Sequence, residues 1–417
     1  MTPQARIDPL IDRLHRLHPR LIDLSLDRLR RLLADLGHPE QRLPPVIHVG
    51  GTNGKGSTCA MIRAMAEAAG SRVHVFTSPH LVRFNERFRV AGALVSDAVL
   101  ADTLERIERV NDGAPITVFE VVTAAAFVLF ADVPADLCVL EVGLGGRGDA
   151  TNVIGPPAAC AIASLSLDHQ DLLGDTLGAI AFEKAGIFKP DVPAVTGFQP
   201  AEALDVLRRA ADGVCPLLVR GEAWTLDGLR YADAAGSVDL PQPGLLGAHQ
   251  LDNAGLALAT LRAAALPHDP AGVAQADWPA RMQRLRHFPS PHELWLDGGH
   301  NPGAGVALAA YLDGWRDRPA YLIVGMKQAK DAATFLAPLL PRVAGAWAVQ
   351  EPGQHLALPV QAIIDASGGV ALAGPTVAGA LAQLSNAPPG RVLICGSLYL
   401  AGEVLKAEMR GQGVPIP

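Results

Sequence analysis

The sequence predicts an α/β fold in two domains, with a mostly parallel sheet in the first. One observation is the alternation of short β-rich runs with helical patterns, which is typical of parallel sheets. Another is the segment "LRHFPSPH", whose two prolines separate a long first block from a shorter block with the same alternation. The 417 residues, 49% of them hydrophobic, are enough for two buried cores. We therefore expect domains at residues 1–286 and 287–417.

The elements of the first block follow in order along the chain. The first 40 residues have a helical pattern with one apolar stripe, formed by Leu21, Leu24, Leu29, Leu32 and Leu33. Residues 46–49 form a β-rich run that ends in glycines, and a helix from about Lys55 to Ala69 follows it. Further strands are predicted by "RVHVFTS", "LCVLEVGLGG" and "PAACAIASLSLDH", and a buried helix by "TVFEVVTAAAFVLFAD". Residues 213–245, rich in Gly, Pro and Asp, predict hairpins or loops.

The second block contains five β-rich runs separated by helical segments. They are "HELWLDGGHNP", "AYLIVGMK", "GAWAVQ", "GVALAG" and "RVLICGSL". This pattern predicts a second, smaller α/β unit.

Composition excludes several classes of protein. The net charge of 35 − 42 = −7 argues against a nucleic-acid-binding protein. Five scattered cysteines without a C-x-x-C pair fit a reducing compartment and argue against disulfides or a zinc site. The most apolar stretch, Val121 to Leu140, is interrupted by Asp132, Pro134 and Asp136, so we expect no membrane span. The charged N-terminus does not resemble a secretory signal, and we expect a cytoplasmic protein.

The stretch "VIHVGGTNGKGSTCAMI" predicts a variant phosphate-binding loop. A strand leads into glycines, a lysine and a helix, whose first N–H groups can bind phosphate. The common loop, G-x-x-x-x-G-K-[ST], places a hydroxyl for magnesium directly after the lysine. Here Gly56 follows Lys55, and Val49 stands at the position of the first glycine. The alternative is an ordinary glycine-rich turn, but the pattern G-x-x-G-K-G-S-T at a strand–helix junction rarely arises by chance.

Polar residues also follow other predicted strands. Glu141 ends one strand, and Asp168 and His169 follow another, so these side chains should meet at the carboxyl edge of a parallel sheet. If Glu141 binds metal, it would supply the metal ligand that the lysine loop lacks. A lone histidine such as His169 is often structural, so this alternative stays open for it. In the second block, Asp297 and His300 also end a strand and could line an interdomain cleft.

Two further stretches allow alternative interpretations. Gly143, Gly145 and Gly148 match the dinucleotide spacing G-x-G-x-x-G, but no helix is predicted after them, as that fingerprint requires. Lys184 has apolar neighbours, and a partly buried lysine can have a lowered pKa. The alternative is a surface lysine paired with Glu183.

Taken together, the motifs resemble the folylpolyglutamate and dihydrofolate synthases, relatives of the Mur peptide ligases. The matching motifs, in the family's order, are "GGTNGKGST", "TSPHLVRFNERFRV", "LEVGLGGRGDATN", "SLDHQDLLG", "EKAGIFKP", "GAHQLDNAG", "LDGGHNP" and "CGSLYLAGEV". They extend from about Ile22 to Val404. The resemblance implies a P-loop-containing N-terminal domain with a mostly parallel sheet and a smaller, Rossmann-like C-terminal domain. It also implies ATP-dependent joining of glutamate to a folate precursor through an acyl phosphate.

The resemblance carries specific roles onto this sequence. It implies ATP contacts at Thr52, Asn53, Gly54, Lys55, Gly56, Ser57, Asn253, Arg281, Asp297 and His300. It implies magnesium ligands at Ser78, Glu141 and His169, and catalytic roles for Lys184, His169, Glu141 and Arg281. A pteroate site is implied at Asp23, Leu24, Ser25, Thr117, Phe119, Glu120, Gly148, Asp149 and Ala150. Leu24 could equally belong to the core.

The implied cofactors and partners are small molecules. They are ATP with two Mg²⁺ ions, dihydropteroate, reduced folates and L-glutamate, without nucleic acid or membrane. Lys184 matches the family's carbamylated lysine, and an apolar setting favours the neutral amine that carbamylation needs. We expect a monomer.

Three positions depart from the family's patterns. Ala280 stands where many relatives have the glycine of P-G-R, and Arg284 competes with Arg281 for the role of the arginine. Gly299 replaces an alanine, which is a mild change. Gly148 precedes Asp149, where many relatives have leucine, and this could alter how the pterin fits.

Other functions are less consistent with these features. A monofunctional folylpolyglutamate synthase would lack only the pteroate activity. A Mur-type peptide ligase would need a UDP-sugar region and a further domain, which are not evident. A nucleotide-dependent switch would not need Glu141, His169 and Lys184 together, and a dinucleotide oxidoreductase would leave Lys55 unexplained.

Overall fold

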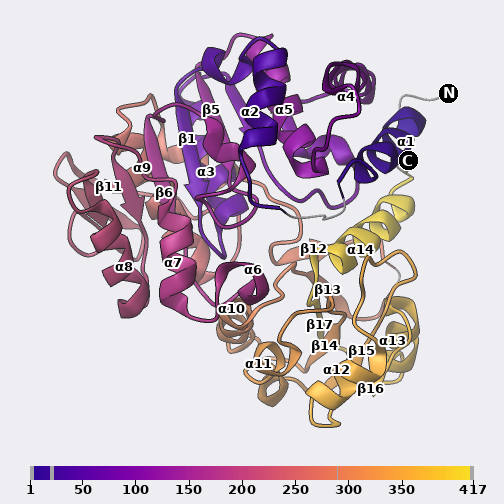
Figure 1. The fold of residues 1–417 in the computed structure, drawn as a ribbon. Helices are drawn as coiled ribbons and strands as arrows, with labels where there is room; N and C mark the ends of the chain where they lie inside the picture. Colours follow the sequence, from indigo (N-terminus) through magenta and orange to yellow (C-terminus); the bar gives the residue numbers. More distant parts are fainter. Residues whose placement is uncertain (1–3, 19–22, 289, 414–417) are drawn as a thin grey trace.

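An eight-stranded sheet forms the centre of the N-terminal domain in this computed structural model, which describes residues 4–18, 23–288 and 290–413 (Figure 1). The strand order is β4-β3-β2-β5-β1-β6-β7-β8, with parallel pairing from β2 through β8. The hairpin β3–β4 adds an antiparallel edge. The bounds are β1 Val46–Gly50, β2 Val73–Phe76, β3 Phe88–Val90, β4 Ala93–Leu94, β5 Leu137–Glu141, β6 Ala159–Ile162, β7 Ala194–Thr196 and β8 Leu217–Val219. The predicted mostly parallel sheet is confirmed.

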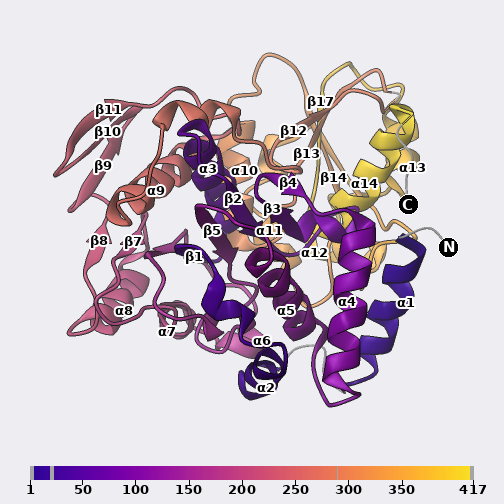
Figure 2. The ribbon, with the colours of Figure 1, turned by 90° about the horizontal axis from the view of Figure 1, so that it is seen from above.

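Helices cover both faces of this sheet, as parallel sheets require (Figure 2). One face packs against α3 and α9, and the other against α5, α7 and α8, with α4 packed on α5. The N-terminal helices α1 and α2 pack on α4 and α5 rather than on the strands. The bounds are α1 Gln4–His15, α2 Asp27–Asp35, α3 Lys55–Ala68, α4 Asp97–Asn111, α5 Val118–Ala131, α6 Gln170–Leu173, α7 Leu177–Ala185, α8 Ala201–Ala211 and α9 Ala248–Ala263.

Residues 213–245, predicted as hairpins or loops, contain β8 of the central sheet and a small antiparallel sheet. Its strands are β9 Trp224–Asp227, β10 Arg230–Asp233 and β11 Gly236–Asp239. Trp224 and Tyr231 are buried and stack against each other beside α9. This small sheet therefore packs on α9, the helix that covers one face of the central sheet.

The C-terminal domain contains a six-stranded sheet in the order β12-β13-β17-β14-β15-β16. The five strands expected from the sequence are β13 Glu293–Leu296, β14 Ala320–Val324, β15 Gly345–Ala348, β16 Leu372–Ala373 and β17 Arg391–Cys395. A sixth, β12 Gln283–Leu285, pairs antiparallel with β13. The boundary expected at 286/287 falls between β12 and β13. Because these two strands pair, the residues of β12, which precede that boundary, belong to the second sheet.

The helices of the C-terminal domain also lie on both faces of its sheet. One core involves α10, α11 and α12, and the other involves α13 and α14. Their bounds are α10 Pro302–Leu312, α11 Ala332–Leu336, α12 Val360–Ala366, α13 Val377–Leu384 and α14 Leu398–Gly411. Within the described residues, no helix is long and apolar enough to cross a membrane.

The N-terminal helical pattern needs one correction. Leu29, Leu32 and Leu33 are buried as predicted, but Leu24 lies before α2 and is 37% exposed. The chain is not helical at Asp23–Ser25, and Leu24 faces a cavity instead of the core. Leu21, the remaining member of the predicted stripe, lies outside the described residues.

Candidate active site

One cavity of about 560 Å³ lies where the carboxyl ends of the two sheets meet. Its N-terminal wall comes from the turns after β1, β2, β5, β6 and β7, and its C-terminal wall from the turns after β13, β14 and β17. Open α/β sheets bind ligands at this edge. The residues predicted from the sequence as ATP contacts, metal ligands, catalytic groups and pteroate contacts all line this cavity.

The glycine loop after β1 presents helix N–H groups to the cavity. The amides of Thr52 and Asn53 both donate to the carbonyl of Ser164, at 2.9 and 3.0 Å, which fixes the loop against the turn after β6. The first intrahelical donor is Thr58 N, so the preceding N–H groups of α3 have no helical partner. Lys55 Nζ lies over the loop, 3.2 Å from Thr52 O. This arrangement suits a polyphosphate.

Gly56 has a structural reason to follow the lysine. A Cβ at this position would lie 2.7 Å from Nε1 and 2.8 Å from Cε2 of Trp278. The indole therefore packs directly on the first turn of α3, where a serine or threonine of the common loop would collide with it. Trp278 also lies in the segment that leads to Arg281, so it connects the phosphate loop to the interdomain linker.

We expect Gly56→Ala to destabilise the fold, although alanine is the better helix former by about 1 kcal/mol. The added methyl must displace Trp278, and overpacking of this kind costs about 1–3 kcal/mol. Urea unfolding measures the loss. In the double variant Gly56→Ala/Trp278→Phe the smaller ring leaves room, so the two effects should be less than additive. Strict additivity would show that the indole contact is not the cause.

Glu141 and Ser78 provide oxygen atoms beside the phosphate loop. The backbone N–H of Ser78 donates to Glu141 Oε2 at 3.0 Å, which orients the carboxylate at the end of β5. Burial raises the pKa of Glu141, and the cation of Lys55 opposes this rise. Ser57 Oγ is buried there without a hydrogen-bond partner. Carboxylate and hydroxyl oxygens are the ligands that Mg²⁺ prefers, so this donor set fits the implied metal.

His169 lies at the cavity edge in a different environment. It has a left-handed backbone (φ 53°) at the start of α6, and its ring is 40% exposed. Burial, together with the cation of Lys330, lowers the pKa of His169 to about 4 although the charge of Asp168 opposes this shift. The ring is therefore neutral at pH 7 and can ligate a metal. Across the described ranges, no three His, Cys, Asp or Glu side chains are grouped as a preformed metal site. A metal here would therefore need oxygen atoms from a ligand as well.

Lys184 is buried, which excludes the alternative of a surface lysine paired with Glu183. Its Nζ donates to Gly51 O at 2.9 Å, directly behind the phosphate loop. Burial, assisted by the charge of Lys55, lowers the pKa of Lys184 to about 7. A large fraction of this amine is therefore neutral at physiological pH and can react with CO₂.

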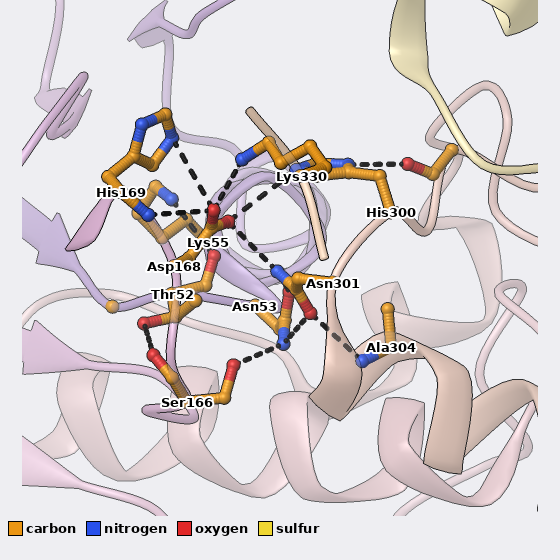
Figure 3. A network of polar contacts seen from close by, with 12 residues as sticks. Thr52, Asn53, Lys55, Ser166, Asp168, His169, His300, Asn301, Ala304 and Lys330 are labelled. Atoms are coloured by element: carbon orange, nitrogen blue, oxygen red, sulfur yellow. Dashed lines mark hydrogen bonds and ion pairs between the residues drawn. The ribbon is translucent and has the colours of Figure 1, made fainter. Parts of the chain in front are cut away.

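Asp168 connects the two domains (Figure 3). Its carboxylate forms an ion pair with Lys330 and accepts a hydrogen bond from Asn301 Nδ2 at 3.0 Å, both from the C-terminal domain. His300 Nε2 lies 3.6 Å away. Burial alone would raise the pKa of Asp168, but His300 and Lys330 hold it well below its usual range. The carboxylate thus stays ionised and fastens the domains together.

The phosphate loop takes part in the same interdomain contact. The side-chain amides of Asn53 and Asn301 exchange two hydrogen bonds, of 3.0 and 2.9 Å (Figure 3). Asn301 also caps α10 by accepting from Ala304 N. The loop that suits phosphates is therefore in direct contact with the start of a C-terminal helix.

Arg281 faces the cavity, whereas its competitor Arg284 lies on β12 beside Glu293. The neighbours of Arg281, Ala280 and Met282, have φ values of 54° and 43°, an uncommon backbone for residues other than glycine. Asp297 holds this conformation, because its Oδ2 accepts from Met282 N at 2.9 Å. Relatives with glycine at the alanine position would adopt it more readily.

The predicted pteroate residues gather at the other end of the cavity. Gly148 lets the chain approach Leu24 closely, since a Cβ there would lie 2.9 Å from Leu24 Cβ. Asp149 accepts three hydrogen bonds, from Leu144 N and from the amide and hydroxyl of Thr151, and so shapes the glycine turn. These contacts leave the leucine exposed toward the cavity.

Thr117 and Glu120 have structural partners of their own. They form a capping box at the start of α5, with Thr117 N donating to Glu120 Oε2 at 2.7 Å. Arg28 donates to the same carboxylate at 3.2 Å and lies 3.5 Å from Asp23 Oδ2. The arginine therefore places the loop of Asp23 over the cavity.

Several residues of the site were not predicted as contacts. Arg28, Trp278, Asn301 and Lys330 act through partners far away in the sequence. Three residues of the site lie within the motifs quoted above, and this location could have marked them as site residues: Arg87, Asp168 and Asn301. Lys330 gave no sign beyond following a β-rich run.

Comparison with known proteins adds to this geometry. Residues 49–198 match the model of the Mur ligase middle domain. The chain is 33% identical to the dihydrofolate synthase/folylpolyglutamate synthase of Escherichia coli (strain K12), over 97% of this chain and 96% of the relative. It is 32% identical to the folylpolyglutamate synthase of Lacticaseibacillus casei, over 92% and 94%.

Solved structures agree over nearly the whole chain. E. coli FolC in complex with DHPP and ADP superposes with a TM-score of 0.89 at 32% identity, covering 97% of this chain and 98% of that one. A bifunctional folylpolyglutamate synthase/dihydrofolate synthase with Mn, AMPPNP and L-glutamate bound gives 0.85 at 33% identity, covering 98% and 99%.

Proposed function

This chain belongs to the dihydrofolate synthase/folylpolyglutamate synthase family, and we propose that it joins L-glutamate first to dihydropteroate and then to reduced folates. It is an ATP-dependent ligase. The observation that carries the proposal is that the residues predicted to bind ATP, metal and pteroate, which are dispersed from Asp23 to His300, all line one interdomain cavity.

The reaction has two bond-forming steps. A carboxylate oxygen of the acceptor attacks the γ-phosphorus of ATP, the bond to the bridging oxygen breaks, and ADP leaves. The amine of glutamate then attacks the acyl carbon, phosphate leaves, and the nitrogen loses a proton to give the amide.

The chain's own groups supply binding and orientation for these steps. The N–H groups at the start of α3, with Lys55 and Arg281, would hold the phosphates. An acyl phosphate hydrolyses in water, so the reaction needs an enclosed site. The contacts of Asp168 with Lys330 and Asn301 support this, because they hold the C-terminal domain over the loop.

Two Mg²⁺ ions and a modified lysine complete the proposed site. Ser78, Glu141 and His169 would hold magnesium, which when bound neutralises phosphate charge. A carbamate on Lys184 would add an acidic group beside the phosphate loop. The lowered pKa of Lys184, about 7, supports this modification because CO₂ adds only to the neutral amine.

Dual activity is supported by the pteroate end of the cavity. Asp23, Leu24 and Ser25 line it, although they come from a segment far from the other contacts. We further propose that the enzyme acts as a monomer in the cytoplasm, where its five free thiols would stay reduced.

Glutamate-dependent ADP release tests the function. Purified protein receives ATP, Mg²⁺ and glutamate with either dihydropteroate or tetrahydrofolate, and ADP and amide product are both measured. We expect turnover with each acceptor. Turnover with tetrahydrofolate alone would indicate a monofunctional folylpolyglutamate synthase, and no glutamate-dependent release with either would contradict the ligase proposal.

A further inference from the structure

The cavity contains more cations than the assigned roles use. Lys330 is paired with Asp168, and Lys184 donates to a loop carbonyl. Lys55 and Arg281 are assigned to the phosphates. Two cavity cations then have no anionic partner among the described residues, Arg87 from the N-terminal domain and Lys327 from the C-terminal domain.

Arg87 is held rigidly at the cavity wall. Its Nε donates to His80 Nδ1 at 3.0 Å, and its guanidinium lies 5.3 Å from the ring centre of Phe84. The backbone carbonyl of Arg87 accepts from Thr77 N at 3.1 Å, which fixes it beside β2. The imidazole occupies Nε, so the two terminal nitrogens remain for a ligand.

The surroundings of Arg87 call for an anion. Burial lowers the pKa of Arg87 to about 10, yet it remains a cation at neutral pH. Within the described part of the chain, no carboxylate lies at ion-pair distance from it, and its free edge opens onto the cavity. An enclosed cation without a partner is costly, which is the expected state of a binding group before its ligand arrives.

The position of Arg87 selects which anion it meets. Arg87 lies at the end of the connection from β2 to β3 that also contains Ser78. Its charge acts to lower the pKa of Glu141, so it lies near the proposed reaction centre. Phe84, whose ring the guanidinium contacts, begins a series of ring contacts that ends at Phe119 in the cavity wall. The ring centres are 6.2 Å apart for Phe84 and Phe88, 5.7 Å for Phe88 and Phe76, and 6.2 Å for Phe76 and Phe119. Lys327, by contrast, lies over Tyr399 at the start of α14.

We propose that Arg87 binds the acceptor carboxylate that becomes phosphorylated, with His80 as its positioning residue. This rests on the proposed function. The carboxylate must approach a γ-phosphate of the same charge, and a cation separate from the phosphate-binding groups removes that repulsion. A guanidinium with two free nitrogens matches a carboxylate in two parallel hydrogen bonds.

Equilibrium binding without turnover tests the assignment. Dihydropteroate and an analogue lacking its carboxyl group are titrated, with neither ATP nor glutamate, into the wild type and Arg87→Met. We expect the wild type to bind the carboxylated ligand with a Kd about tenfold to a hundredfold lower than that of the analogue. This ratio corresponds to the energy of hydrogen bonds between charged groups. Arg87→Met should lose this preference while its affinity for the analogue is unchanged, which also reports that the site is folded.

Two control variants remove a positive charge elsewhere. Arg89, two residues along, does not line the cavity, so Arg89→Met should keep the wild-type preference. Lys327→Met removes the cation of the other domain and should keep it as well. Arg87→Lys, which retains charge but not the paired geometry, should fall between the wild type and Arg87→Met.

The outcomes separate this proposal from the proposed function. A full carboxylate preference in Arg87→Met would overturn the assignment. So would a rise in the KM for glutamate with an unchanged KM for dihydropteroate, because Arg87 would then serve the incoming amino acid. A wild type that binds neither pteroate ligand would instead contradict the proposed function.

Discussion

Replacing Lys184 by alanine is expected to lower kcat by about 10²–10³-fold, the usual cost of removing one preorganised group from a reaction centre. ATP binding should weaken by less than about tenfold, because the variant loses only one hydrogen bond, from Nζ to Gly51 O. Steady-state ADP release gives kcat, and nucleotide titration gives the ATP affinity. The expected result is therefore a protein that binds ATP and hardly turns over.

Carbamylation of Lys184 can be followed directly. With ¹³C-labelled bicarbonate, we expect an NMR carbamate signal in the wild type that is absent from Lys184→Ala. Because the amine becomes neutral above its pKa of about 7, the signal should grow as the pH rises through that value. The matched control is Lys189→Ala, because Lys189 is a half-buried lysine with a lowered pKa that lies outside the cavity. This variant should keep the carbamate signal. Full activity in Lys184→Ala would show that the carbamate has no role.

Replacing Glu141 by glutamine is expected to abolish turnover at every magnesium concentration. The amide oxygen still accepts from Ser78 N, but the negative charge for the metal is gone. We expect a loss of at least about 10³-fold in kcat, at the upper end for a single group. Glu67→Gln, on α3 outside the cavity, should keep normal activity and magnesium dependence. Wild-type magnesium dependence in Glu141→Gln would refute the metal assignment.

At pH 7, Glu141→Gln should be at least as stable as the wild type. Burial raises the pKa of Glu141 above its ordinary value of 4.5, so the unfolded carboxyl ionises at lower pH than the folded one. The favourable contribution of Glu141 to the free energy of unfolding is present below the unfolded pKa and is lost as the pH rises through the folded pKa. At pH 7 the glutamine removes a destabilising charge, so its Tm should equal or exceed that of the wild type, and the advantage should shrink toward pH 4. A lower Tm at pH 7 would mean that the carboxylate has a stabilising partner.

Most of the candidate site was predictable because its residues follow predicted strands. Glu141, His169 and Asp297 were recognised by their position at strand ends, and in a parallel sheet these ends share one edge. The variant loop was recognised by its lysine and glycines at a strand–helix junction. Leu24 was predicted less well, since a leucine before a helical stripe has the same local pattern whether it faces a core or a ligand.

The sequence by itself determined the alternation of strands and helices, the phosphate loop and the strand-end residues. Each of these depends on periodicity or backbone chemistry within a few neighbouring residues. Only the tertiary structure decided that Trp278 covers Gly56 and that Lys330 and Asn301 hold Asp168 across the domains. It also decided that Arg87 lines the cavity with no carboxylate of the described residues at ion-pair distance. These contacts join residues that are distant in sequence, and the energies of burial and charge that fix them exist only once both sheets are packed.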